Sequence, residues 1–330
     1  MSTLKNSKAP ATVSASWGAL FANGNGLKAS ALALGVMLHA TNVYLATTVM
    51  PSIIKEIGGL AYYAWNTTLF VVASVIGSVI SANRLAALGP RKAYQYAILL
   101  FAIGSLLCTL APSMQVLLLG RFVQGLGGGL LFALSYAMVR IVFEDRLWSR
   151  AMALISGMWG IAAFSGPLIG GLFAEQGQWR WAFGVLIIIC GIIFGVSSII
   201  LPVKQSGEAA PQVPYVKLMF LVVASLAVSI GSLSTSVGMN LLGLLVALFL
   251  LASLVRMEGQ QGVRLLPTGA YQIGQTLGAT YAVMTLLTLA TAIEIFVPYF
   301  AQVIYGFSPL QSGYLTVLIA FGWTFSSLLF

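Results

Sequence analysis

The sequence has little charge for its length. Of its 330 residues, 7% are Asp, Glu, Lys or Arg and 59% are hydrophobic. Soluble domains carry about 25% charged residues because water must solvate their surface. Lipid must therefore solvate much of this chain, and the composition predicts an all-α membrane protein.

Cofactor and metal chemistry also lacks support. The chain has one histidine and two cysteines, Cys108 and Cys190, and both cysteines lie in apolar stretches, so no disulfide framework is implied. No metal-ligand cluster, nucleophile–base pair or ATP-binding motif is present. The glycines of residues 125–129 lie inside an apolar run without a preceding soluble strand, so they are no dinucleotide fingerprint. We expect neither an enzyme nor a cofactor or metal site.

Long apolar runs fill most of the chain. A helix needs about 20 apolar residues to cross the hydrocarbon core. Ten segments meet this requirement and predict about ten transmembrane helices: residues 30–53, 64–83, 93–111, 116–139, 151–173, 182–202, 217–233, 237–255, 274–301 and 313–330. Residues 1–29 have no apolar core near their start, so they predict a cytoplasmic tail and no cleavable signal peptide.

The net charge of +9 comes from basic residues in alternate loops. One set of loops holds nearly all of them, whereas the other holds Lys55 and Arg180 alone. Cytoplasmic loops carry the excess of Lys and Arg, so the N-terminus is predicted to be cytoplasmic. The distribution indicates contact with membrane lipid and no nucleic-acid partner. The richer set comprises Lys5, Lys8, Lys28, Arg84, Arg91, Lys92, Arg140, Arg146, Arg150, Lys204, Lys217, Arg256 and Arg264.

One cation lies inside a predicted span. Arg121 falls within residues 118–129, which end in a run of glycines. A charge at bilayer depth costs roughly 2.5–3.5 kcal/mol on insertion scales, so it usually faces a cavity or a partner. Glycines let neighbouring backbones approach closely. A buried arginine among close-packed helices indicates a membrane protein that handles a solute.

Several motifs together resemble the major facilitator superfamily, and its 14-span drug:proton antiporter branch in particular. The resemblance covers about residues 30–330. It rests on Arg121 with Gln124 and the glycines of 125–129, residues 166–171 with Gly157 and Gly160 before them, residues 89–92 after the second span, residues 179–183, and residues 297–302 followed by 306–313. Two spans, 217–233 and 237–255, separate the sixth span from the motif at 297–302, where a 12-span member would have only a loop.

The resemblance implies a major facilitator helical bundle with a defined domain order. Residues 30–202 would form the N-terminal six-helix bundle, and residues 203–266 a linker with two extra transmembrane helices. Residues 267–330 would be the first two helices of an incomplete C-terminal bundle. The family's last four spans would then be missing, or a partner would supply them.

The resemblance also assigns a conformational role to eight residues. In the family, the fifth-span motif seals the extracellular side between the two halves, and the basic loop motif follows the second span. Pro167 removes a helix hydrogen bond and permits a bend, and the glycines, Gly160 among them, offer small surfaces for tight helix contact. The residues are Gly89, Arg91, Lys92, Gly157, Gly166, Pro167, Gly170 and Gly171.

This chain departs from the family pattern at two carboxylates. Ala86 stands where the loop motif has an aspartate, and Asn42 stands where the first-span motif of the branch has one. Asparagine can hydrogen-bond a substrate but cannot carry a proton. The sequence therefore lacks one expected proton site.

Three residues are candidates for proton coupling. Glu294 is the acidic residue that lies well inside a predicted span, and burial favours the neutral form of a carboxylic acid. Arg121 lies in the substrate cavity in the family and influences proton exchange. His39 precedes Asn42 by one turn and titrates near neutrality when unperturbed. The alternative is that each is a hydrogen-bonded packing residue.

Five polar or aromatic residues are candidates for substrate binding: Asn42, Asn66, Gln124, Tyr299 and Gln302. Each could equally satisfy a helix neighbour. The sequence as a whole predicts a proton-coupled secondary transporter in a bacterial plasma (inner) membrane, exporting a hydrophobic compound that can be cationic. A transporter of an endogenous metabolite or organic anion, or a non-transporting membrane fragment, are the alternatives.

Overall fold

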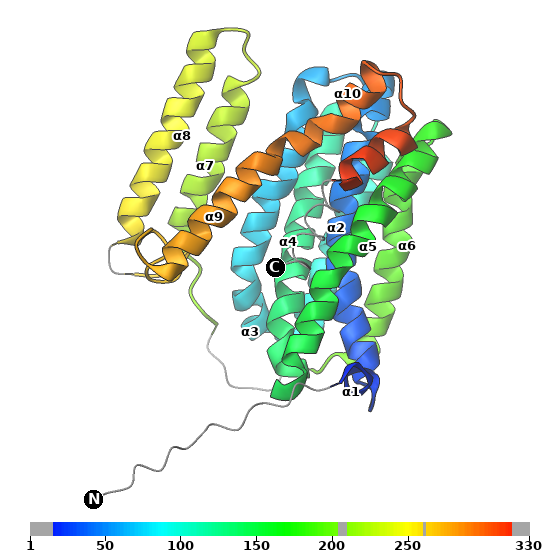
Figure 1. Cartoon of the computed structure of the whole chain (residues 1–330), viewed down its shortest axis with the longest axis vertical. Coiled ribbons are helices and arrows are strands. Elements are labelled where there is room, and N and C mark those ends of the chain that lie inside the picture. Colours follow the sequence, from blue (N-terminus) through cyan, green and yellow to red (C-terminus); the bar gives the residue numbers. More distant parts are fainter. Residues whose placement is uncertain (1–15, 204–209, 260–261, 319–330) are drawn as a thin grey trace, which may run out of the picture.

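The computed structural model describes residues 16–203, 210–259 and 262–318. Every regular element in these ranges is a helix, so the predicted all-α architecture is confirmed (Figure 1). The elements are α1 (Trp17–Phe21), α2 (Asn25–Ile57), η1 (Leu60–Tyr62), α3 (Tyr63–Thr109), α4 (Met114–Val142), η2 (Asp145–Leu147), α5 (Trp148–Glu175), α6 (Trp179–Ile200), α7 (Tyr215–Gly231), α8 (Val237–Glu258), α9 (Thr276–Thr291), η3 (Ala292–Phe296) and α10 (Val297–Val303).

Seven helices of the described ranges are long and apolar enough to cross a membrane by length and composition. One of them, the 50 residues of Leu60–Thr109, contains two predicted spans. Helix α7 is a shorter apolar helix. Residues 309–318 are helical and begin the last predicted span, whose remaining residues lie outside the described part. The chain is thus an integral, multi-pass membrane protein.

Helix α3 folds back on itself at Gly89. The backbone there has φ 77° and ψ 168°, a conformation that glycine adopts readily. The first limb packs on α4 with Phe70 near Gly125 and Ser74 near Gly129, so the two run in the same direction. The second limb runs the opposite way, with Phe101 near Gly127. The two predicted spans are therefore an antiparallel pair joined by a tight bend.

Glycines set the distance between α3 and α4. A β-carbon at Gly129 would lie 2.0 Å from the carbonyl oxygen of Ser74, and one at Gly125 would lie 2.4 Å from that of Phe70. Side-chain hydroxyls strengthen the contact, because Ser74 and Ser78 each donate to a glycine carbonyl of α4 at 3.1 Å. The glycine run is thus a surface for backbone contact, as predicted for tight membrane packing.

A polar clamp joins α2 and α6 at the end of the bundle where α2 finishes. The carboxylate of Glu56 accepts from the indole Nε1 of Trp179 at 2.6 Å and pairs with Arg180. Arg180 also donates to the Ala111 carbonyl at 2.9 Å, just beyond α3. The clamp therefore ties three helices together near residues 56, 111 and 180.

Helices α7 and α8 form a separate hairpin beside the bundle (Figure 1). They touch where Gly243 packs against the backbone of Ala227. The ammonium of Lys217 at the start of α7 lies 2.8 Å from the carboxylate of Glu258 at the end of α8. That carboxylate also accepts from the backbone amide of Leu265 at 3.0 Å. One buried ion pair thus closes the open end of the hairpin.

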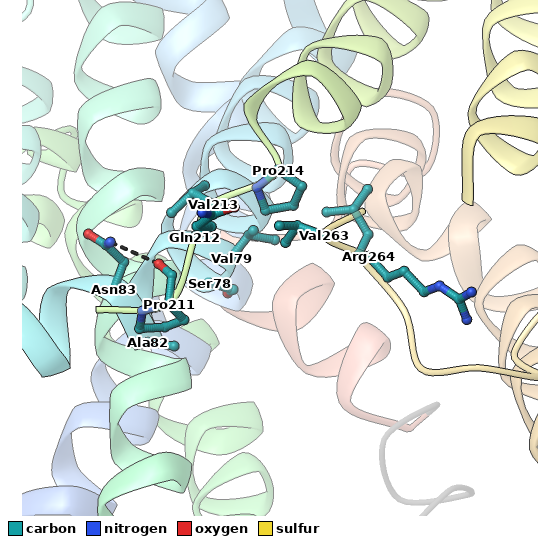
Figure 2. Close-up of a pocket in the computed structure, with 11 residues that line it drawn as sticks. Ser78, Val79, Ala82, Asn83, Pro211, Gln212, Val213, Pro214, Val263 and Arg264 are labelled. Atoms are coloured by element: carbon teal, nitrogen blue, oxygen red, sulfur yellow. Dashed lines mark hydrogen bonds between the residues drawn. The ribbon is translucent and has the colours of Figure 1, made fainter. Parts of the chain in front are cut away.

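A cavity of about 350 Å³ lies where this hairpin joins the bundle. Figure 2 shows its wall, formed by the first limb of α3, the segment before α7 and the segment after α8. The amide of Asn83 donates to the Pro211 carbonyl at 3.0 Å and fastens the linker to α3. Arg264 lies at its edge with the guanidinium directed away from the labelled wall (Figure 2).

The ninth span differs from its prediction. A continuous helix over 274–301 was expected, but α9 stops at Thr291, a 3₁₀ turn follows, and α10 begins at Val297. Pro298 supplies a physical reason, because proline removes a backbone donor and crowds the preceding turn. Glu294 therefore lies on a 3₁₀ turn between two helices and not inside a continuous one.

Candidate functional site

Arg121 lies at the junction of α2, α3 and α4 and is 1% exposed. Its Nη1 donates to Oδ1 of Asn42 at 3.0 Å and to Oε1 of Gln124. Its Nε donates to the backbone carbonyl of Asn66 at 3.4 Å. The Phe70 ring covers the guanidinium at 4.2 Å. We call Arg121, Asn42, Asn66 and Gln124 the Arg121 cluster.

The cluster brings together four sequence-predicted residues from three helices. Gln124 follows Arg121 by one helical turn, which places both side chains on one face of α4. Asn42 is supplied by α2 and Asn66 by the first limb of α3. Ser105 was missed, although its hydroxyl accepts from Nε2 of Gln124 at 2.8 Å. A lone serine in an apolar run gives no signal that could have identified it.

Neutral groups alone hold the Arg121 charge. No carboxylate of the described ranges bonds or pairs with this guanidinium. Two polar atoms of the cluster, Nδ2 of Asn42 and Oδ1 of Asn66, are buried and have no protein partner there. Buried polar atoms are nearly always bonded, so these two leave capacity for water or a ligand.

His39 lies beside the cluster among aromatic rings. Its ring centroid is 5.3 Å from that of Phe70, 5.4 Å from Phe132 and 6.3 Å from Trp159. Its Nδ1 is buried without a partner in the described part of the chain. A β-carbon at Gly128 would lie 2.7 Å from this nitrogen, so the glycine leaves room for it. Proton relay by His39 stays a prediction.

Glu294 lies apart from the Arg121 cluster, on the 3₁₀ turn η3. Its side chain is half-buried, and it makes no hydrogen bond or ion pair within the described ranges. The Tyr63 hydroxyl donates to the neighbouring Ile295 carbonyl at 3.0 Å. The turn that carries the carboxylate is thus fixed against the first half of the chain.

Tyr299 and Gln302 occupy contacts between the two halves. The Tyr299 ring lies 5.2 Å from that of Tyr63 on α3. Nε2 of Gln302 donates to the Thr48 carbonyl of α2 at 3.1 Å and to the Ser312 hydroxyl at 2.7 Å. In this conformation Gln302 therefore bonds to neighbouring helices, which was the alternative to a role in substrate binding. Thr48 and Ser312 were not predicted.

The fifth-span motif packs on both halves. A β-carbon at Gly166 would lie 2.6 Å from Cβ of Tyr44, and one at Gly171 would lie 2.6 Å from Cα of Leu310. A β-carbon at Gly170 would lie 3.1 Å from the carbonyl oxygen of Leu45. Pro167 lies under Gly313, whose β-carbon would be 2.7 Å from it. The motif thus forms a three-way contact of α5 with α2 and residues 309–318.

Tight packing at Gly157 was predicted and is wrong for this structure. Among the described residues, a β-carbon at Gly157 or Gly160 would meet nothing within 4 Å. Both glycines precede the contact region of α5 by at least one turn. Glycine content alone does not show which glycines face a neighbour, because the direction each faces depends on tertiary packing.

The basic loop motif is a bend that contacts the end of α6. Gly89 supplies the positive φ of the turn. The Nε of Arg91 donates to the Leu201 carbonyl at 2.9 Å. The backbone amide of Arg91 donates to the Pro202 carbonyl at 3.2 Å. A cation at the last carbonyls of a helix is favourable. Lys92 is exposed.

The architecture defines the class of this protein. A multi-pass helical bundle with a buried arginine cluster, a glycine–proline contact between its halves and a half-buried carboxylate is typical of a secondary transporter. The chain belongs to the Major Facilitator Superfamily, whose profile matches residues 32–330. The predicted family is therefore confirmed, and the relatives in this family are transporters, not enzymes.

Curated relatives narrow the comparison. A probable multidrug-efflux transporter of Mycobacterium tuberculosis is 36% identical over 300 residues, covering 89% of this chain and 64% of the relative. Multidrug resistance protein 3 of Bacillus subtilis is 24% identical over 313 residues, covering 90% of this chain and 59% of the relative. The chain spans less than two thirds of the length of these relatives.

Solved structures share the fold. A POT family transporter crystallised in meso superimposes with a TM-score of 0.57 at 12% identity, covering 91% of this chain and 68% of that one. A peptide transporter of the POT family gives 0.56 at 17% identity, with the same coverage. Similarity at this identity supports the helical arrangement alone.

Proposed function

We propose that this protein is a proton-coupled secondary transporter that exports a hydrophobic, drug-like compound, cationic compounds included. It would work by alternating access in a bacterial plasma membrane, with its N-terminus in the cytoplasm. The relatives named for multidrug efflux support the cargo class, and the positive-inside pattern supports the orientation. These relatives are longer than this chain, which covers 64% and 59% of their lengths.

Glu294 is the observation that carries the proposal. The carboxylates of Glu56, Glu144 and Glu258 pair with basic side chains, and that of Glu175 accepts a backbone amide. Glu294 has no such partner in the described ranges and lies half-buried at a break between two apolar helices. Ionisable groups at membrane depth usually mark ion or substrate pathways. An unpaired carboxylate there can exchange a proton with the two sides in turn.

Alternating access requires a contact that opens and closes. The contact of α5 with α2 and residues 309–318 involves backbone and small side chains, supplemented by the Gln302 hydrogen bonds. It lies along the second half of α2, which on the predicted topology is the extracellular half. We infer that this conformation is closed toward the outside. Rocking of the halves about this contact would expose the site to each side in turn.

The remaining predicted residues take roles within this scheme. Arg121 would influence proton exchange, with His39 beside it as a relay. Asn66, Gln124 and Tyr299 would contact cargo within or near the Arg121 cluster and η3. The bend at residues 89–92 would tie the fold-back of α3 to the end of α6 while the halves move.

The test is drug extrusion driven by an imposed pH gradient in membrane vesicles that hold the protein. Glu294→Gln should abolish it, because the amide cannot carry a proton. Arg121→Ala should lower the rate by about tenfold or more, which corresponds to about 1.4 kcal/mol. Glu144→Gln makes the same chemical change in an exposed loop and should leave the rate unchanged. Undiminished extrusion with both Glu294→Gln and Arg121→Ala would remove this mechanism.

A further inference from the structure

The Arg121 cluster has donors to spare. A guanidinium has five N–H groups. Nε and Nη1 are used by Asn66, Asn42 and Gln124, whereas Nη2 has no acceptor in the described ranges. The Asn42 amide is oriented by this contact, because Nη1 can only donate and Oδ1 must therefore face it. Nδ2 of Asn42 is then a second free donor on the group that touches the guanidinium.

The cluster also lacks a negative charge. Arg121 and Asn42 are 1% and 0% exposed, so water does not screen the cation from outside. A buried charge normally has an opposite charge close by, because neutral dipoles only partly replace its hydration. Among the described residues, neutral oxygens alone contact this guanidinium. The site is therefore short of one anion.

We propose that Nη2 of Arg121 and Nδ2 of Asn42 form a subsite for an anionic oxygen, and that its ligand is a carboxylate on an aromatic or aliphatic body. Charge-assisted hydrogen bonds to a guanidinium favour a carboxylate over a neutral carbonyl. Phe70 covers the guanidinium and stacks on His39, and His39 also lies beside Phe132 and Trp159, so an apolar body has aromatic neighbours. The assignment of this carboxylate to exported cargo rests on the proposed function.

A matched pair of probes tests the subsite. 2-Naphthoate and 2-naphthamide share the same ring system and differ in charge, and naphthoate is fluorescent. The purified protein in chloride-free lipid nanodiscs should bind naphthoate saturably. Its affinity for naphthoate should exceed that for the amide on the order of tenfold, which corresponds to about 1.4 kcal/mol of binding free energy. Equal affinity for the two probes would overturn the proposal.

Two variants at Asn42 separate charge from donor. Asn42→Asp supplies an internal carboxylate to Arg121 and should abolish naphthoate binding. Asn42→Ala removes the free donor without adding charge and should weaken binding on the order of tenfold. Asn240→Asp makes the same change on α8, far along the chain from the cluster, and should bind as the unaltered protein does. If Asn42→Asp folds and binds naphthoate as tightly as the unaltered protein, the subsite is contradicted. If Asn42→Asp does not fold, unchanged naphthoate affinity in Asn42→Ala contradicts it.

Two further measurements show which anions the subsite accepts and distinguish failure of the subsite from failure of the proposed transport function. Added chloride that displaces naphthoate supports the subsite and shows that a free inorganic anion also fits; no displacement supports a carboxylate-selective subsite. Naphthoate binding is measured at equilibrium without a proton gradient, so it reports the subsite whether or not the protein transports. In the unaltered protein, intact naphthoate binding together with absent gradient-driven transport would contradict the proposed function and leave the subsite standing.

Discussion

The bundle of α2–α6 and the helices after it are held together differently. In the apolar stretch of α2, 72% of the residues are buried, compared with 17% for that of α8 and 6% for that of Thr276–Val303. Backbone contacts at glycines and a buried polar cluster fix the first region. An ion pair at one end and close contacts at Gly231 and Gly243 fix the α7–α8 hairpin.

This difference indicates where function requires precision. The Arg121 cluster needs three helices at fixed spacing, and the glycine run of α4 provides that spacing. After α8, Tyr299 packs against α3, Gln302 bonds to α2, and Glu294 lies on the 3₁₀ turn that precedes them. Under the proposed function, the closely packed first region would move as a unit against the less buried helices that follow it.

The largest expected effect comes from adding one methyl group at the α3–α4 contact, which tests whether glycine spacing holds the first region together. Gly129→Ala would place a carbon 2.0 Å from the Ser74 carbonyl and must push the helices apart. We expect a loss of about 3 kcal/mol or more, at or beyond the upper end of typical overpacking. The readout is the thermal unfolding temperature in detergent.

Gly157→Ala is the matched control for that change, because no described residue lies within 4 Å of its added methyl. Alanine has the higher helix propensity, so this variant should be unchanged or more stable by about 0.5–1 kcal/mol. Equal unfolding temperatures for the two variants would show that glycine spacing does not hold this bundle.

The second change tests the hairpin and should have a smaller, local effect. The Lys217 and Glu258 side chains are 10% and 2% exposed, so Glu258→Gln leaves a mostly buried ammonium unpaired. Breaking such a pair costs about 3 kcal/mol. Hydrogen exchange should accelerate in α7 and α8 and stay unchanged in α2–α6.

An exposed pair supplies the comparison for this variant. Glu144 and Arg146 side chains are 69% and 63% exposed, and Glu144→Gln should have no measurable effect on exchange, as is common for surface pairs. Faster exchange throughout α2–α6 in Glu258→Gln would contradict the separation of the two regions.

The sequence allowed the fold to be predicted in outline because apolar length is a strong signal. Helix bounds agree within a few residues for most spans, and the family assignment from Arg121, residues 166–171 and residues 297–302 is confirmed. The break at η3 was missed. The hydropathy of the sequence is the same in a helix and in a 3₁₀ turn, so it gives no signal at the break. Pro298 was interpreted as part of a continuous span.

The candidate site was only partly predictable. Arg121, Asn42, Asn66 and Gln124 were each selected as polar residues in apolar spans, but their mutual hydrogen bonds depend on how three helices rotate. The same dependence explains the wrong expectation for Gly157 and the partners that were missed, Ser105, Thr48 and Ser312. Local sequence indicates that a polar group needs a partner without indicating which one.

The central claim is that Glu294 holds a proton that cargo displaces. The most direct measurement is proton release on cargo binding, followed with a pH-indicator dye in weakly buffered protein. We expect the unaltered protein to release a proton when an exported compound binds, and Glu294→Gln to bind the compound without release. Proton release of the same size from Glu294→Gln would contradict the account.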